Sequence, residues 1–260
     1  MRLRILGAHQ AEARDCRFVA LLLDEVLAID AGSLASALTL AEQARLAYVL
    51  LTHQHLDHVR DLPVVAFNRL SLGAGPLVVV ASPAVQAVIR ATLMDPRIWL
   101  DLFADQPDRP APLRFQPAVP GQTLSLGPYT VRPVALATHP VPVLGYQVTG
   151  PAGRSLFYTG DTGPGCAAIW PLVRPDVLVI EVTFADSAVD LARQAGHLTP
   201  TLLRQELIQF RAVHGYLPQV VVLHTNPAHR PAIIQELRAV AADLGVSLVV
   251  AHEDLTLPLD

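Results

Sequence analysis

The residues best suited to chemistry in this sequence lie in one short stretch, LTHQHLDHVRDL, which contains His53, His55, Asp57 and His58. The stretch directly follows the apolar run LAYVLL, so we expect it to leave a buried strand as a loop, where binding groups are commonly carried on a rigid scaffold. Neutral imidazole and carboxylate groups are ligands for zinc, and less specifically for manganese or iron. Since no single regular element can aim all four side chains at one point, two neighbouring metal centres are predicted to divide them. The alternative is a polar surface loop that happens to be rich in histidine.

Short apolar runs bounded by Gly, Pro or Asp predict the buried strands that would position this loop. The runs are FVALLL, VLAID, AYVLLT, PLVVVAS, YTVRPVAL, LGYQV, SLFYTG, VLVIE, QVVVLH and VSLVVAH. Helices are predicted after Ser82, over 199–215 and over 231–245, the last two ending at a glycine. The proline-rich segment 101–120 is predicted to be a long irregular connection. Consecutive strands in the first half and alternating strands and helices in the second predict stacked sheets with helices outside.

The composition indicates a well-packed chain with little charge. Of 260 residues, 52% are hydrophobic and 16% are charged, the net charge is −4, and the chain contains Arg but no Lys. An acidic chain without a clustered basic surface is disfavoured as a binder of a nucleic-acid polymer. Cys16 and Cys166 fit no CxxC pattern and are expected to be free thiols. No apolar run is long enough to span a membrane and no signal peptide is recognisable, so the expected location is cytoplasmic.

The HQHLDH stretch resembles the HxHxDH signature of the metallo-β-lactamase superfamily, whose fold is an αββα sandwich with a two-metal site at the strand ends. Three later motifs, LATHPVP, LFYTGDTG and VVVLHTNP, contain His139, Asp161 and His224 in the order that this resemblance requires. The resemblance implies one such hydrolase domain over residues 1–260 and two bound zinc ions, or manganese or iron in their place. In the implied site, Asp161 is shared by both metals. The remaining ligands would be His53, His55 and His139 for one metal, and Asp57, His58 and His224 for the other.

The segment LVIEVTFADSAVDLARQAGHLTP narrows the resemblance, because it places Glu181 at a strand end and His197 before a helix. This pair resembles one found in the phosphodiesterase branch, which comprises the tRNA 3′-processing endonucleases (ribonuclease Z) and the class II cyclic-nucleotide phosphodiesterases. His197 would stabilise charge on a phosphoryl oxygen or protonate the departing alkoxide, and Glu181 would orient it and raise its pKa. Asp57 is predicted to be catalytic as well as a ligand. The alternative is a helix-start histidine and an unrelated loop carboxylate.

Four stretches favour the cyclic-nucleotide branch: HLDHV, LAIDAGS, RIWLDLF and GHLTP resemble its motifs, and no basic insertion resembles the arm with which the tRNA enzymes hold their substrate. The predicted function is a di-zinc phosphodiesterase that hydrolyses a small cyclic nucleotide such as 3′,5′-cAMP, by attack of a hydroxide held between the metals. The alternatives are a ribonuclease Z-like RNA endonuclease, a metallo-hydrolase of another ester class and a non-catalytic metal-binding protein. The predicted partners are a small-molecule phosphodiester and, as among relatives, a second copy in a homodimer.

Two positions depart from the family pattern. Asp61 stands where a glycine is usual, and Asn226 stands where a lysine often follows the last ligand. Asp61 would alter a helix start or add a carboxylate near the metals, whereas Asn226 removes a cation that could have faced a phosphate. Arg60 is predicted to form a salt bridge at the surface rather than to face substrate. The aromatic residues Trp99 and Phe103 are predicted to pack in the core, with the wall of a base pocket as the alternative.

Overall fold

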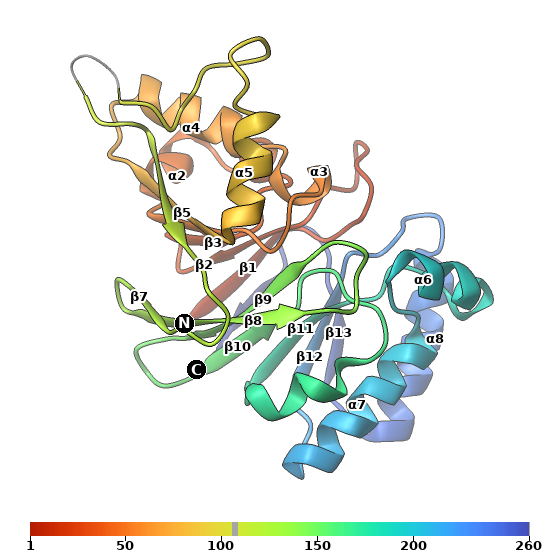
Figure 1. Cartoon of the computed structure of the whole chain (residues 1–260). Coiled ribbons are helices and arrows are strands. Elements are labelled where there is room, and N and C mark those ends of the chain that lie inside the picture. Colours follow the sequence, from red (N-terminus) through yellow and green to blue (C-terminus); the bar gives the residue numbers. More distant parts are fainter. Residues whose placement is uncertain (106–108, 260) are drawn as a thin grey trace.

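Two stacked sheets form the centre of the molecule in a computed structural model that describes residues 1–105 and 109–259 (Figure 1). In spatial order, the first sheet contains β14 (Thr256–Pro258), β1 (Arg2–Gly7), β2 (Ala20–Leu23), β3 (Leu27–Ile29), β4 (Tyr48–Leu50), β5 (Leu77–Ala81) and β6 (Leu113–Pro117). The second contains β13 (Leu248–Val250), β12 (Gln219–Leu223), β11 (Val177–Glu181), β10 (Ser155–Tyr158), β9 (Val143–Thr149), β8 (Tyr129–Leu136) and β7 (Leu124–Leu126).

Helices cover the outer face of each sheet. Those that follow strands of the first sheet are α1 (Leu34–Ala37), α2 (Leu40–Arg45), α3 (Leu56–Val59), α4 (Leu62–Ser71) and α5 (Pro83–Ala91). Those of the second are α6 (Val189–Ala195), α7 (Pro200–His214) and α8 (Arg230–Leu244), with short 3₁₀ turns at Cys166–Ala168, Trp170–Leu172 and Asp186–Ala188. In Figure 1, α4 and α5 lie on one side of the two sheets and α7 and α8 on the other. The predicted αββα sandwich is therefore confirmed.

Three apolar layers hold the sandwich together. Strand side chains such as Val131 and Tyr146 fill the space between the two sheets, where they are fully buried. Leu203 and Phe210 of α7 pack on the outer face of the second sheet, and Val65 of α4 lies in the equivalent layer on the first. Because a sheet with two buried faces needs apolar side chains in both directions, its strands read as the continuous apolar runs of the sequence.

The predicted helices begin and end at the residues whose side chains or conformations favour a helix terminus. The Ser82 hydroxyl accepts a hydrogen bond from the Val85 N–H (3.2 Å) at the start of α5, and Thr199 does the same for Leu202 N–H (3.4 Å) in α7. Helix α7 ends at Gly215, which adopts a left-handed φ of +76°. Helices after Ser82, over 199–215 and over 231–245 are thus confirmed.

One predicted connection contains a strand. Within 101–120, which was expected to be irregular, residues Leu113–Pro117 form β6 and pair in parallel with β5. The prolines did not prevent this because β6 is the last strand of its sheet and Pro117 is its final residue, and an edge strand tolerates a missing N–H. Residues 106–108 of this segment lie outside the described part of the chain.

Parallel pairing brings several strand ends to one edge of the sandwich. Strands β3 to β6 run parallel to one another, as do β10 to β13. The carboxyl ends of parallel strands meet at the same edge of a sheet, which is where open α/β sheets bind ligands. Among the described residues, no helix is both long and apolar enough to pass through a bilayer.

Candidate metal centre

The candidate metal centre is built at these carboxyl ends. The stretch with His53 leaves β4 of the first sheet, whereas Asp161 follows β10 and His224 follows β12 of the second. Gly160 directly precedes Asp161 with a φ of +65°, and a Cβ at this glycine would lie 2.9 Å from the side chains of Thr52 and Val143. The Gly-Asp-Thr turn therefore needs glycine both for its left-handed backbone and for its close packing against Thr52 and Val143.

The structure brings the seven predicted ligands together in two groups that share Asp161. In each group, one ligand atom from every member lies within 4.8 Å of the others. The first group is His53, His55, His139 and Asp161, and the second is Asp57, His58, Asp161 and His224. Asp161 directs Oδ2 to the first group, 3.6 Å from His53 Nε2, and Oδ1 to the second, 3.2 Å from His58 Nε2. A carboxylate placed in this way can bridge two cations.

Unpaired buried atoms show that these residues suit a metal. Nε2 of His53, His58 and His139 and Oδ1 of Asp161 are buried without a hydrogen-bond partner among the described residues. Buried polar atoms are nearly always paired, and four exceptions at one point need an explanation. Nitrogen and oxygen donors in this number are the ligands that zinc takes. The set therefore fits two divalent ions, one in each group.

Four of the imidazoles are each oriented by a second contact from the other ring nitrogen, as is usual for metal ligands. The Nδ1 partners are Thr52 Oγ1 for His53 (3.0 Å), Asp30 Oδ2 for His58 (2.7 Å), the Gly196 carbonyl for His139 (3.1 Å) and Thr183 Oγ1 for His224 (2.7 Å). These contacts leave Nε2 of all four rings to face the centre.

The charges in the centre also favour bound cations. Burial and the neighbouring His58 ring lower the pKa of His53 well below its usual value, so its ring is neutral and its lone pair is available. Burial opposes ionisation of Asp161, but the surrounding histidines outweigh it and lower its pKa. Burial lowers the pKa of His58 too, yet Asp161, Asp30 and Asp57 together raise it well above the usual value. Three carboxylates around one ring are a concentration of negative charge that a dication would balance.

Asp30 is a functional residue that the sequence reasoning missed. It lies just after β3, is fully buried and adopts a left-handed φ of +60°. Besides His58, its carboxylate accepts hydrogen bonds from the Thr52 N–H (2.9 Å) and the Tyr158 hydroxyl (3.1 Å). A signal was present, because a carboxylate directly after the apolar run VLAI is costly to bury unless it is paired.

His197 and Glu181 form a buried pair beside both groups. Glu181 Oε1 accepts hydrogen bonds from His197 Nδ1 (2.5 Å) and the Thr162 N–H (3.0 Å), and Oε2 accepts from the Thr183 hydroxyl (2.6 Å). The His197 ring lies 5.2 Å from that of His139 and 5.3 Å from that of His224, centre to centre. Burial disfavours protonation of His197, but the Glu181 carboxylate outweighs it and raises the pKa to about 9. The histidine is therefore charged at neutral pH and can donate from Nε2.

The departure at Asp61 acts on a helix rather than on the centre. Its Oδ2 accepts hydrogen bonds from the N–H groups of Ala35 (2.7 Å) and Ser36 (3.3 Å), at the start of α1, and Oδ1 accepts from Arg60 (2.9 Å). Both oxygens are thus occupied, and Asp61 belongs to neither ligand group. Arg60 also pairs with Glu12 (2.7 Å), so its predicted salt-bridge role is confirmed.

Two other sequence predictions concern Asn226 and the aromatic residues Trp99 and Phe103. Asn226 is bonded to Gln10 (3.2 Å) and to the Ala228 N–H (3.0 Å), which fixes the loop after His224 but supplies no cation. Phe103 is half-buried against the core, but Trp99 is 42% exposed, so the core prediction was wrong for the tryptophan. Its ring packs edge-on against that of Phe67 on α4, with 5.5 Å between ring centres.

Comparison with known proteins identifies the family. The model of the beta-lactamase superfamily domain matches residues 22–225, and the chain belongs to that superfamily. We therefore place it among the proteins of the metallo-β-lactamase fold. Three curated relatives are named ribonuclease Z. One, from Bradyrhizobium sp. (strain ORS 278), is 36% identical over 115 residues, which are 44% of this chain and 36% of the relative. Another, from Mycolicibacterium paratuberculosis, is 28% identical over 228 residues, which are 80% of this chain and 68% of the relative. The chain spans between a third and a half of the length of the first two curated relatives that it matches.

Solved structures agree on the fold. Unliganded yeast PDE1 superposes with a TM-score of 0.82 at 18% identity, covering 98% of both chains, and YhfI from Bacillus subtilis with a TM-score of 0.79 at 18% identity, covering 99% of both. The short form of human tRNase Z superposes with a TM-score of 0.71 at 20% identity over the full length of both chains. At these identities the likeness concerns the fold alone.

Proposed function

We propose that this protein is a di-metal phosphodiesterase, most active on a small cyclic nucleotide such as 3′,5′-cAMP. The observation that carries the proposal is the His197–Glu181 pair, which lies in ring contact with a ligand of each group. A hydrolase needs a proton donor within reach of the leaving oxygen, and the bond to Glu181 holds this one charged and oriented. The resemblance of this pair to that of the phosphodiesterase branch supports the same reaction class.

The ligand sets would hold two zinc ions, with manganese or iron as alternatives. When bound, such ions supply a nucleophilic water near neutral pH and balance the charge that develops on phosphorus. Asp161 would hold the two sites at a fixed separation, because each of its oxygens faces one group. Asp57 has a dual role in this proposal: its Oδ2 lies 3.2 Å from His224 Nε2, and as the more exposed carboxylate of the two it can also orient a water molecule.

His197 performs the proton step. Its Nδ1–H is committed to Glu181, so the proton that leaves comes from Nε2, on the side of the ring away from the carboxylate. As a water oxygen adds to phosphorus and the P–O bond to the alkoxide breaks, donation of this proton to the departing oxygen would give a hydroxyl group and a phosphate monoester. Glu181 is itself held by Thr162 and Thr183, so the donor has little freedom to turn away. This pre-orientation is what makes the pair effective.

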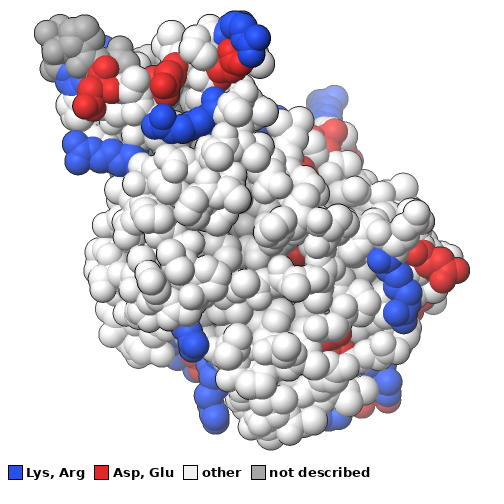
Figure 2. All heavy atoms as spheres, viewed as in Figure 1, with Lys and Arg blue, Asp and Glu red and all other residues white. Residues whose placement is uncertain are grey.

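A ribonuclease Z-like RNA endonuclease is the second candidate, favoured by the names of the curated relatives. The chain offers little to hold a long polyanion: between His139 and Asp161 lie β9, β10 and a short turn, with no protruding arm in this described segment. On the face in Figure 2, Arg side chains are few and interspersed with acidic ones, and no basic stripe crosses the surface. Salt-sensitive binding of tRNA would favour this alternative.

We also propose a homodimer in which a second copy covers the exposed apolar surface around Trp99. Six large apolar side chains are exposed on α3, α4 and the segment after α5: Leu56, Val64, Phe67, Ile98, Trp99 and Leu100. Apolar patches of this kind on a soluble chain commonly mark an interface. Light scattering of wild type and Trp99→Ser tests this: the substitution should shift the mass from dimer to monomer. A wild type that is monomeric at high concentration would refute the homodimer.

An activity panel tests the function directly. Zinc- or manganese-loaded protein is assayed with 2′,3′- and 3′,5′-cyclic nucleotides, bis(p-nitrophenyl) phosphate, a precursor tRNA, a β-lactam and a thioester. We expect turnover of the phosphodiesters, with a cyclic nucleotide as the best substrate. Cleavage of the tRNA in preference to all small esters would select the second candidate. Hydrolysis of the lactam or thioester alone would refute the phosphodiesterase while leaving the fold and the metal groups intact.

A further inference from the structure

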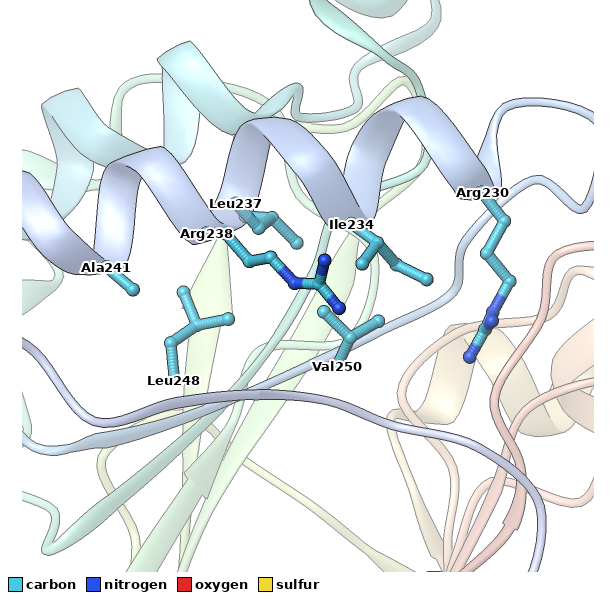
Figure 3. Close-up of a pocket in the computed structure, with 7 residues that line it drawn as sticks. All are labelled: Arg230, Ile234, Leu237, Arg238, Ala241, Leu248 and Val250. Atoms are coloured by element: carbon cyan, nitrogen blue, oxygen red, sulfur yellow. The ribbon is translucent and has the colours of Figure 1, made fainter.

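A second concave site lies between helix α8 and the edge strand β13, in a cavity of about 310 Å³ (Figure 3). Its lining residues come from these two elements alone: Arg230, Ile234, Leu237, Arg238, Ala241, Leu248 and Val250. None of them belongs to the metal groups or to the His197–Glu181 pair. The cavity is at the small end of the range in which proteins bind organic ligands.

The floor of this cavity, which we call the α8 groove, is apolar for reasons that the sequence makes clear. Ile234, Leu237 and Ala241 are spaced three and four residues apart and so share one face of the helix. Leu248 and Val250 are two apart on the strand, and Figure 3 shows both side chains rising toward α8. Except for the buried Leu237, these side chains are only half-buried, so apolar area remains open to a ligand.

Two arginines without ion pairs border this floor. Within the described part of the chain, Arg238 makes no hydrogen bond or salt bridge, and in Figure 3 its guanidinium lies over the groove between Ile234 and Val250. Arg230 stands at the end of the groove, with one long hydrogen bond from Nη2 to the Ala251 carbonyl (3.4 Å) and a buried Nε that has no partner. By contrast, Arg204 on the neighbouring helix α7 pairs with Asp243 (2.7 Å). No carboxylate lines the groove.

The open edge of β13 adds hydrogen-bond donors. Ser247 O and Ala251 N–H bond to Val220 and Val222 of β12, so the alternating backbone groups of Leu248 and Val250 point away from the sheet. An edge of three residues is too short for stable addition of another strand. A second copy is disfavoured as well, because two facing grooves would bring four guanidinium groups together. A small ligand fits these features better than a peptide or a second protomer.

We propose that the α8 groove binds a small amphipathic anion, a carboxylate or phosphate monoester carried on a compact apolar body. The planar guanidinium of Arg238 or Arg230 presents paired N–H donors that match such a head group. The apolar body lies on Ile234, Leu248 and Val250, where it removes exposed hydrocarbon from water. The site needs neither the metals nor the proposed phosphodiesterase reaction.

Titration with octyl phosphate and octanoate tests the proposal, with octanol and octyltrimethylammonium as neutral and cationic probes of similar size. Binding to the full metal-loaded chain is followed by methyl NMR of Ile234, Leu248 and Val250, since an alkyl phosphate held only at the metals would leave these signals unmoved. We expect saturable shifts with at least one anion, about tenfold tighter than with octanol. The better of the two anions identifies the head group. Equal affinity for octanol, or no saturable shift with either anion, would overturn the proposal.

Two groove variants and one control variant test the role of the arginine charges. Arg238→Gln and Arg230→Gln should each raise the dissociation constant about tenfold, because one charge-assisted contact is lost. Arg114→Gln is the matched control, since Arg114 is also exposed without an ion pair among the described residues, on the edge strand β6 of the other sheet. It should bind as the wild type does. All three variants should have the melting temperature of the wild type. They should also hydrolyse bis(p-nitrophenyl) phosphate at the same rate as the wild type, whether that rate is high or low. Unchanged affinity in both groove variants would refute the role of the arginines.

Discussion

The two sheets contribute to the metal centre in different ways. After β4, the first sheet supplies four predicted ligands within six consecutive residues, from His53 to His58. The second sheet supplies its ligands singly, from the ends of different strands, and adds the His197–Glu181 pair. The ligands from the first sheet are close in sequence, so a chain that forms only β4 and the loop after it already brings them near one another. The contribution of the second sheet depends on three strand ends meeting across the sandwich, so assembly of the centre and of the fold are the same event.

Burial does not separate the two contributions. In the first, His53 and His58 are fully buried but His55 and Asp57 are half-buried, and in the second His197 retains 8% exposure. The two contributions differ instead in the groups that they supply: the first supplies ligands alone, whereas the second supplies the shared carboxylate and the hydrogen-bonded histidine–glutamate pair. We infer a division of labour: the first sheet mainly binds metal, and the second bridges the metals and moves protons.

The largest effect is expected from Asp161→Ala, which removes the residue that joins the two contributions. Both groups lose a ligand at once, so metal content should fall below the two ions of the wild type. Hydrolysis should fall by far more than the roughly 100-fold typical of losing an outer partner. Elemental analysis together with bis(p-nitrophenyl) phosphate turnover checks both. Asp243→Ala, at an exposed ion pair on α8, is the control and should change neither. Full metal content in Asp161→Ala would mean that the groups bind independently.

A smaller loss is expected from His197→Ala, which tests whether proton transfer can be separated from metal binding. Turnover should fall about 100- to 10,000-fold, the usual contribution of a general acid, with two metals retained. Glu181→Gln should give part of the same loss because it leaves the histidine less firmly charged. As a control, His252→Ala removes an exposed histidine far from this pair in sequence, and it should change neither turnover nor metal content. Loss of metal in His197→Ala would instead make it a structural support of the ligands.

The same contrast explains how much the sequence could predict. HQHLDH is recognisable because its ligands are adjacent, and the stacked sheets follow from apolar runs of strand length between turn residues. The sequence could mark Asp30 as a buried carboxylate that needs a partner, but it could not identify His58 as that partner, because the two residues follow different strands. Trp99 was misplaced because composition alone does not tell an aromatic side chain of the core from one at the surface. Strand β6 was not predicted because its segment contains prolines, which a strand tolerates only at the edge of a sheet.

The substitution Asp30→Asn should lower metal affinity to an intermediate degree, and it tests how the first sheet supports its ligands. The substitution keeps the shape but removes the charge that fixes His58 through Nδ1 (2.7 Å). Loss of such a partner typically lowers metal affinity about 10- to 100-fold. Competition with a chromogenic chelator measures this affinity. The second group should weaken more than the first, because Asp30 contacts His58 directly but reaches His53 only through Thr52. Equal weakening of both sites would argue that Asp30 supports the fold of the loop and not one ligand.

The smallest effect is expected for Glu42, which lies on α2 in the helical layer of the first sheet, away from the metal centre. The hydrogen bond from Arg4 (2.8 Å), together with those from Thr39, lowers the pKa of Glu42 from 4.5 to about 2. Because the folded pKa lies below the unfolded value, this stabilisation is complete above about pH 4.5 and is lost as the pH falls toward 2. Glu42→Gln preserves the capping partner of Thr39 but removes the ion pair, so it should lower the free energy of unfolding by about 1 kcal/mol at pH 7.

Urea unfolding of wild type and Glu42→Gln between pH 7 and pH 3 measures this difference, which should shrink as the solution is acidified. Arg4→Gln should show the same trend, since it removes the other member of the pair. Metal content and turnover at pH 7 should stay at wild-type levels, because a loss of this size leaves nearly all molecules folded. A stability difference that does not depend on pH would assign the effect to packing of α2 and not to the charge. A loss of metal at pH 7 would mean that the ligands after β4 depend on the stability of α2, although they are adjacent in the sequence.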